Sequence, residues 1–262
     1  DQSTHVAGTI QCQVCHNRVS RSKDTAVMPS GIVLDGLGRN ADCFECHQGR
    51  TSRLQVEEAV AGVGADVAQA GIKLPTLHNR AAGPTSFGMR AQSGYEYPGL
   101  SYVARYRHVN ELDTCITCHD PHSLDVDPVR CSACHLGVRT QADLRAIRST
   151  NVDYDGDGDI SEGIAAEIEA LQGHLLRAMQ IYTSVTEGCE RLVYESGFKN
   201  DQGAWYATWT PRLLKAAYNY HYTIVESGSY AHNARYAIQL LYDSLNDLGA
   251  STAGLPRPEA NP

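Results

Sequence analysis

The chain has 262 residues, which is enough for one large domain or two modest ones. Its formal net charge of −8 argues against a protein that binds nucleic acid or an anionic membrane surface. Its apolar runs all fall short of the roughly 18–20 residues that a membrane-spanning helix needs, which argues against an integral membrane protein. The first residues, Asp1-Gln2-Ser3-Thr4, have no charged or apolar leader pattern, so we expect a chain whose signal peptide was removed or never existed.

The unusual features of the composition are 9 cysteines and 11 histidines. Eight of the cysteines form four Cys-x-x-Cys pairs, and a histidine follows each pair directly. The residue frequencies alone predict only about 0.01 occurrences of such a motif. The four motifs are Cys12-Gln13-Val14-Cys15-His16, Cys43-Phe44-Glu45-Cys46-His47, Cys115-Ile116-Thr117-Cys118-His119 and Cys131-Ser132-Ala133-Cys134-His135.

The chemistry of covalent haem attachment explains this spacing. Two thiols three positions apart can add to the two vinyl groups of one haem, and the histidine that follows then ligates the iron. Zinc sites or disulfides are the alternative, but zinc does not require a histidine directly after the second cysteine in all four motifs. We therefore predict four c-type haems, held by the eight motif cysteines, with His16, His47, His119 and His135 as proximal ligands. Because such attachment takes place outside the cytoplasm, we expect an extracytoplasmic protein.

Residues 1–139 contain every haem motif and read as irregular, with Gly, Pro and polar residues interrupting short apolar runs. We predict that this region is tetrahaem-binding and that the haems supply much of its core. The segment between the second and third motifs predicts a short helix at about 56–70 and a β-hairpin at 95–106 around Pro98-Gly99. The third and fourth motifs are separated only by residues 120–130, so we expect their haems to lie close together.

Residues 140–262 read as a helical region, because apolar side chains recur there at spacings of three and four. The predicted helices cover 141–148, 161–187, 211–226 and 230–248. Pro211 suits the first turn of the third helix, and Gly249 suits the end of the last. The predicted fold class is mainly α with much irregular coil, a haem-dominated core in the N-terminal half, a helical C-terminal part and one small hairpin.

Four haem irons need four distal ligands if every site is closed. The chain has only 3 methionines, so we expect bis-histidine ligation, which gives lower reduction potentials than Met/His ligation. His174 and His221 lie within predicted helices and are expected to be structural. The predicted distal ligands are His5, His78, His108 and His122, with His232 as the alternative.

The segment 151–162, Asn151-Val152-Asp153-Tyr154-Asp155-Gly156-Asp157-Gly158-Asp159-Ile160-Ser161-Glu162, has the alternating acidic pattern of an EF-hand-type calcium loop. A register that starts at Asp153 has carboxylates at positions 1, 3 and 5 but places Ile164 where a bidentate Glu belongs. A register that starts at Asn151 places Glu162 there but loses the apolar residue at position 8. The alternative is a solvated acidic turn before a helix. We predict a calcium ion held by Asp153, Asp155, Asp157, Asp159 and Glu162, as a clamp between the two regions.

These features together resemble the multihaem c-type cytochromes. The resemblance rests on the four haem motifs, the element Cys118-His119-Asp120-Pro121-His122, the acidic loop and the helical C-terminal third. More narrowly, the chain resembles extracellular tetrahaem cytochromes whose subunits polymerise into conductive filaments. This resemblance implies a homopolymer that carries electrons over long distances, in which a histidine of one subunit, here His5, ligates a haem of the next.

The sequence thus predicts an electron carrier rather than an enzyme, without catalytic residues. Its expected partners are other redox proteins or extracellular electron acceptors, and its expected location is the cell exterior or surface rather than the periplasm. Two alternatives remain open. One is a small multihaem reductase with an open coordination position at one iron, and the other is a monomeric periplasmic electron carrier.

Overall fold

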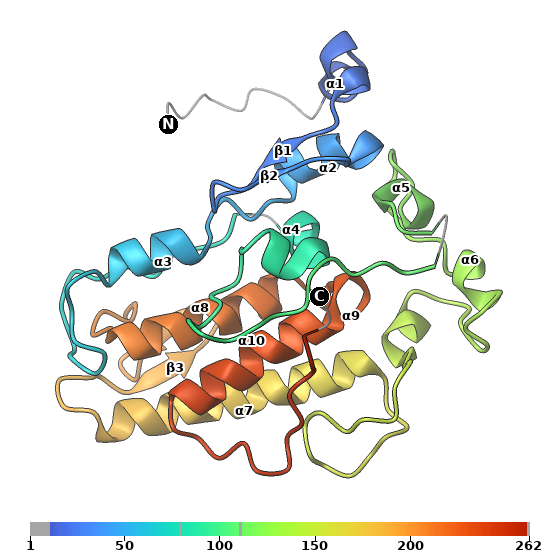
Figure 1. The fold of residues 1–262 in the computed structure, drawn as a ribbon. Helices are drawn as coiled ribbons and strands as arrows, with labels where there is room; N and C mark the ends of the chain where they lie inside the picture. Colours follow the sequence, from blue (N-terminus) through green and yellow to red (C-terminus); the bar gives the residue numbers. More distant parts are fainter. Residues whose placement is uncertain (1–10, 79, 110–111, 261–262) are drawn as a thin grey trace.

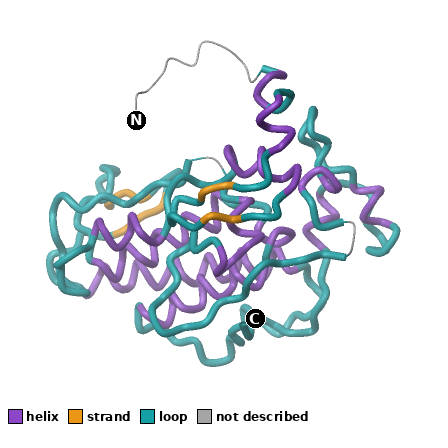
Figure 2. The backbone as a smooth tube through the Cα atoms, turned by 45° about the horizontal axis from the view of Figure 1, so that its top comes forward, coloured by secondary structure: helices purple, strands orange, loops and turns teal. Residues whose placement is uncertain are grey.

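The computed structural model describes residues 11–78, 80–109 and 112–260. The prediction of a mainly helical chain with much coil is confirmed, and there are two small two-stranded antiparallel sheets in the described part. Three long helices lie together on one side of the molecule, and the short elements of the N-terminal part lie along and beyond them (Figure 1). Figure 2 shows long loops, in teal, running along the outside of the helices.

The elements of the N-terminal part are short. They are the 3-10 turn Cys12–Val14, α1 (Arg18–Ser22), β1 (Ala26–Val27), β2 (Val33–Leu34), the 3-10 turn Gly38–Asn40, α2 (Ala41–Cys46), α3 (Arg53–Ala59), α4 (Ala82–Phe87), the 3-10 turn Gly88–Arg90, α5 (Cys115–Cys118) and α6 (Pro128–Ser132). α3 is shorter than the predicted helix at 56–70. A polar side chain starts it: Ser52 accepts a hydrogen bond from the Leu54 N–H at 3.2 Å.

The C-terminal part contains the long helices. Its elements are the 3-10 helix Ala142–Ala146, α7 (Ile164–Val185), β3 (Leu192–Tyr194), β4 (Phe198–Asn200), α8 (Pro211–Val225), α9 (Ser229–His232) and α10 (Ala234–Asp247). The predicted helix at 230–248 is divided into α9 and α10. The division falls at Asn233, whose φ of −172° is extended and whose side chain caps α10 by accepting the Tyr236 N–H. Within the described residues, every helix is too short or too polar to cross a lipid bilayer.

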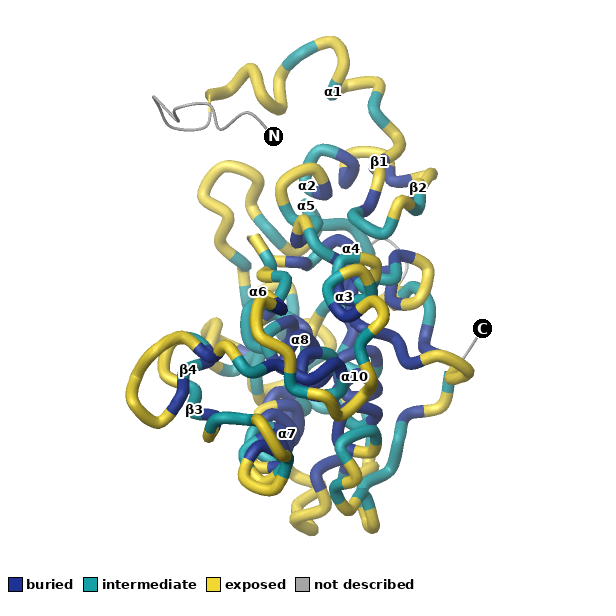
Figure 3. Tube along the Cα trace, turned by 90° about the vertical axis from the view of Figure 1, so that its left-hand side faces the viewer, coloured by how far each residue is buried: buried dark blue, intermediate teal, exposed yellow. Residues whose placement is uncertain are grey.

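The main hydrophobic core lies between α7, α8 and α10, where buried residues concentrate in Figure 3. Leu171, Leu213 and Leu240 from these helices are fully buried. Val56 and Tyr95 belong to the same cluster, so it includes residues from both sides of the predicted boundary at 139/140. A smaller cluster holds β1, β2, α2 and α4 together; its buried members are Ala26, Met28, Leu34, Leu37, Ala41, Phe44, Phe87 and Ala91.

The hairpin predicted at 95–106 is wrong. The segment is coil without a strand ladder, and part of its backbone hydrogen-bonds to side chains of two helices. The Tyr95 N–H donates to Asn219 of α8 at 2.8 Å, and the Val103 N–H donates to Gln239 of α10 at 2.9 Å. These buried amide side chains satisfy the backbone groups that a partner strand would have satisfied.

Glu96 supplies a test of this core. Its carboxylate is 5% exposed and accepts the Tyr236 hydroxyl at 2.8 Å, and burial raises its pKa from 4.5 to about 7. The folded protein therefore holds this proton more tightly than the unfolded chain, so its contribution to stability is present below pH 4.5 and is lost as pH rises towards 7.

We expect Glu96→Gln to remove this decline and to raise the unfolding free energy at pH 8 by about 1–3 kcal/mol. Urea unfolding at pH 5 and pH 8 measures both values. A wild-type stability that rises over this range relative to the variant would contradict the assignment.

Candidate cofactor and metal sites

Each Cys-x-x-Cys-His motif forms a single helical turn. In all four motifs the N–H of the histidine donates to the carbonyl of the first cysteine, at 2.8–2.9 Å. Residues at positions i, i+3 and i+4 of such a turn share one face. The two thiols and the imidazole of each motif therefore originate from the same side of the backbone, which is the arrangement that a haem with two thioethers and one iron ligand requires.

The motif cysteines lie near the surface. In the last three motifs the first cysteine is half-buried and the second is exposed, and both cysteines of the first motif are exposed. Apolar side chains beside the motifs are exposed as well: Leu136, next to His135, is 93% exposed, and Val129 and Leu124 are exposed by about two thirds.

Three motif histidines face a second histidine that belongs to no motif. The ring centroids of His16 and His122 are 6.1 Å apart, with ring planes within 10° of parallel. His135 and His108 are separated by 6.0 Å. The third pair, His119 and His232, is separated by 6.4 Å. His122, His108 and His232 come from three different parts of the chain, so tertiary structure and not local spacing forms the pairs.

These distances match two imidazoles on opposite sides of one metal ion. A ligating nitrogen lies about 2 Å from the metal and about 1.1 Å from its own ring centre, so two such rings have centroids roughly 6.2 Å apart. The centroid distances of all three pairs lie within about 0.2 Å of that spacing. A cavity of about 310 Å³ adjoins one of them and is lined by Cys118, His119 and Arg130 among others. The residues present therefore fit a haem at these motifs.

Hydrogen bonds fix which nitrogen is available in the third pair. The Nδ1 atom of His119 is 3.2 Å from the Leu124 carbonyl, and the Nδ1 atom of His232 is 2.8 Å from the Glu226 carboxylate. A carbonyl or carboxylate accepts from a ring N–H, so the proton of each ring is on Nδ1. Nε2 of both rings is left to bind a metal.

The second motif differs from the other three. Among the described residues no second ring is paired with His47, and its Nδ1 atom is buried without a hydrogen-bond partner. His78 is exposed, and its backbone N–H donates to the Gly49 carbonyl at 2.8 Å, which places it beside this motif. The predicted ligand His5 lies outside the described residues.

Contacts between motifs show that they lie side by side. The thiols of Cys43 and Cys115 hydrogen-bond to each other, which lowers the pKa of Cys43 to about 7. Asn40, at the start of α2, accepts the Cys115 N–H at 2.8 Å and so ties the second motif to the third. The Arg130 guanidinium, before the fourth motif, donates to the Thr117 carbonyl at 3.2 Å. The second motif therefore contacts the third, and the third contacts the fourth.

The geometry of the motifs does not suit zinc. In the described residues, the groups of three or more ligand atoms that lie within 4.8 Å of one another are all acidic, and no motif cysteine or histidine belongs to one. A structural zinc site needs four such ligands around one point.

The acidic loop folds around its own first carboxylate. The two oxygens of Asp153 accept the N–H groups of Gly156 and Gly158, at 2.6 and 2.8 Å. Both glycines have positive φ, +82° and +92°, a region that side chains disfavour. The glycines thus allow the sharp turns that bring successive carboxylates to one side.

Three of these carboxylates converge. Oxygens of Asp155, Asp157 and Glu162 lie within 4.8 Å of one another. Burial raises the pKa of Asp155 to about 6, and burial together with the neighbouring carboxylates raises the pKa of Glu162. The Oε1 atom of Glu162 is buried and has no hydrogen-bond partner among the described residues. The cluster has the oxygen ligands and the excess negative charge that favour a hard divalent cation.

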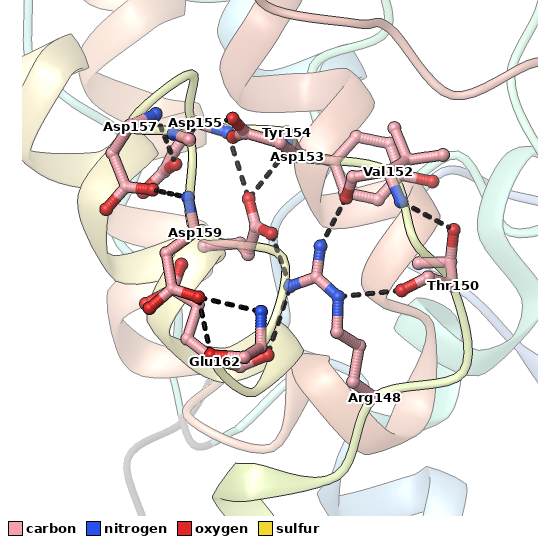
Figure 4. A network of polar contacts seen from close by, with 12 residues as sticks. Arg148, Thr150, Val152, Asp153, Tyr154, Asp155, Asp157, Asp159 and Glu162 are labelled. Carbon is pink, nitrogen blue, oxygen red and sulfur yellow. Dashed lines mark hydrogen bonds and ion pairs between the residues drawn. The ribbon is translucent and has the colours of Figure 1, made fainter.

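Glu167 and Arg148 support the loop from beneath. Glu167 is fully buried, and it accepts the N–H groups of Tyr154 and Asp155 and forms an ion pair with Arg148 at 2.5 Å. Arg148 also donates to loop carbonyls, as Figure 4 shows. One Glu167 oxygen lies within 4.8 Å of carboxylate oxygens of Asp153 and Asp155. The buried ion pair thus contributes to holding the loop in this shape.

The loop combines the two registers that the sequence left open. It uses Asp153 to close the turn, as the first register requires, and it brings Glu162 to Asp155 and Asp157, as the second requires. Asp159 is in neither acidic group of the described residues, and its carboxylate accepts the backbone and hydroxyl of Ser161.

Two functional candidates escaped the sequence patterns. Glu167, within α7, and Glu226, just after α8, are both fully buried carboxylates, and nothing in their local sequence separates them from solvated ones. No protein-family model, no curated protein and no solved structure matches the chain. The arguments for function therefore depend on its own residues.

Proposed function

We propose that the protein is an electron carrier with four covalently attached c-type haems. The observation that supports this most directly is the spacing of the three histidine pairs, each of which joins one motif histidine to one histidine outside the motifs. In the proposal the eight motif cysteines form the thioethers. The proximal ligands are His16, His47, His119 and His135, and the distal ligands opposite the first, third and fourth are His122, His232 and His108.

When bound, the haems would supply one-electron chemistry at low potential, since two neutral imidazoles raise the potential less than a Met/His pair. The chain's own contribution is to hold both rings of a pair in place through oxidation and reduction. Carbonyl and carboxylate acceptors at Nδ1 keep the rings from rotating. The exposed apolar side chains beside the motifs would be covered by the porphyrins.

The side-by-side motifs suit transfer between haems. Because the second, third and fourth motifs contact one another directly, an electron entering at one needs no diffusion step to reach the next. The partners in this proposal are other redox proteins or extracellular electron acceptors. The proposed location is extracytoplasmic, because covalent haem attachment takes place outside the cytoplasm.

The second motif separates the electron-carrier proposal from its main alternative. A multihaem reductase needs one iron with an open coordination position, and His47 is the motif histidine without a paired ring among the described residues. We infer that His78, which lies beside this motif, or His5 closes the site. A His5 supplied by a neighbouring chain would join subunits into the homopolymer that the resemblance to filament cytochromes implies.

We also propose that the acidic loop binds one calcium ion through Asp155, Asp157 and Glu162. The buried, unpartnered Oε1 atom of Glu162 supports this proposal. The loop joins the segment after the fourth motif to the start of α7, so a bound ion would clamp the motif region to the helices.

The histidine pairs predict the effect of removing one ligand. We expect His122→Ala, His108→Ala and His232→Ala each to keep four haems per chain and to convert one haem in four from low-spin to high-spin. The oxidised spectra and low-temperature EPR measure this conversion. His174→Ala is the matched control, because His174 is half-buried within α7 and is expected to leave all four haems low-spin. A pair variant with unchanged spectra would contradict the assignment of that pair.

The second motif predicts a different experiment. His78→Ala and His5→Ala are compared for spin state and for particle size by negative-stain microscopy. If a neighbouring subunit closes the site, His5→Ala alone produces one high-spin haem and abolishes filaments. If His78 closes it, His78→Ala alone produces the high-spin haem. Two variants that both remain fully low-spin would contradict this account, and a high-spin haem in the unaltered protein would favour the reductase.

Calcium binding predicts a change in thermal stability. An ion present at 100 times its dissociation constant stabilises by about 2.7 kcal/mol. For a chain of this length that stabilisation raises the melting temperature by about 5–10 °C, and a chelator should remove the increase. We expect Glu162→Gln and Asp157→Asn to lose the response to calcium. Asp159→Asn is the control and should keep it, since the Asp159 side chain bonds to Ser161. A melting temperature that the chelator leaves unchanged would contradict calcium binding.

A further inference from the structure

Glu226, just after α8, is a fully buried carboxylate that contacts a histidine. Its Oε1 atom lies 2.8 Å from Nδ1 of His232, and its Oε2 atom has no hydrogen-bond partner among the described residues. The ion pairs of the described part of the chain give it no Lys or Arg, only His232. Burial of a carboxylate is costly unless positive charge lies nearby, and His232 is the basic side chain that contacts it among the described residues.

The surroundings fix the His232 ring closely. A Cβ atom added at Gly228 would lie 2.7 Å from Cε1 and 3.0 Å from Nδ1 of His232, so the glycine leaves room for the ring. The His232 N–H donates to the Gly228 carbonyl at 2.9 Å. The next residue, Asn233, caps α10 and donates to the Ala104 carbonyl at 3.1 Å. The backbone on both sides of the ring is therefore anchored.

The two rings of this pair differ in their acceptors. On the motif side, Nδ1 of His119 meets the carbonyl of Leu124 at 3.2 Å. On the other side, Nδ1 of His232 meets the Glu226 carboxylate at 2.8 Å. The described part of the chain contains no other ion pair between a histidine and a carboxylate. A carboxylate acceptor makes its histidine a stronger donor to a metal than a carbonyl acceptor does.

We propose that Glu226 is a positioning residue for the haem of the third motif. It holds the Nδ1 proton of His232 so that Nε2 is the ligating nitrogen, and its charge makes that nitrogen a stronger donor. This inference rests on the proposed function. A stronger donor and a nearby negative charge both favour ferric over ferrous iron, so the carboxylate lowers the reduction potential of this one haem.

Glu226→Gln tests the proposal, because Gln keeps the shape and an acceptor oxygen but removes the charge. We expect four haems per chain, all with unchanged spin state, and one of four redox transitions moved to a more positive potential. The EPR signal of one low-spin haem should change with it. Glu96→Gln is the matched control, because Glu96 is also buried but bonds to Tyr236 and to no histidine. At pH 8, above its pKa of about 7, it should leave all four transitions in place.

The outcomes separate this inference from the proposed function. If all four redox transitions of Glu226→Gln keep their potentials while the haems are intact, the role of Glu226 is overturned. The proposal of an electron carrier is then unaffected. An equal movement in Glu96→Gln would also overturn the role of Glu226, since removal of any buried carboxylate charge would then suffice. A wild-type chain without covalent haem would instead overturn the proposed function. If Glu226→Gln does not accumulate, Glu226→Asp replaces it. Its shorter carboxylate should move the same transition by a smaller amount, and no movement would overturn the role.

Discussion

The rest of the account depends on pairs of imidazole rings whose centroids lie about 6 Å apart. The three pairs keep this spacing although the angles between their ring planes differ, at 10°, 47° and 43°. Contacts other than those between the two rings are therefore needed to hold each ring in place. In the third pair the Leu124 carbonyl and the Glu226 carboxylate do this through Nδ1. A metal ion bound by both rings of a pair would require about this centroid spacing.

The helical core explains how such a spacing persists. α7, α8 and α10 form a rigid base, and the segment before the third motif bonds to Asn219 and Gln239 of that base through its backbone. His232 follows from the same base, at the break between α9 and α10. The ring opposite the third motif is thus supported by the main core, whereas the motif turns themselves lie near the surface. That division suits a protein in which cofactors bind to a preformed scaffold.

The sequence predicts those parts of the site whose chemistry requires adjacent residues. A haem with two thioethers needs both cysteines and the histidine in one turn, so the four motifs can be read directly. The partner of each motif histidine comes from tertiary structure, which explains why His232, chosen only as an alternative, lies opposite His119. The turn residues Pro98-Gly99 suggested a hairpin at 95–106, because the sequence does not reveal that amides of α8 and α10 bond to that backbone. Glu226 and Glu167 were missed because burial, not residue type, distinguishes them.

The central claim is that paired histidines close most of the irons in a chain with four covalent haems. Near-infrared magnetic circular dichroism of the oxidised protein, together with the haem content per chain, tests it most directly. The account predicts four haems per chain, of which at least three give the low-spin signature of two imidazole ligands. A chain without covalent haem, or one in which two or more haems are high-spin, would contradict it.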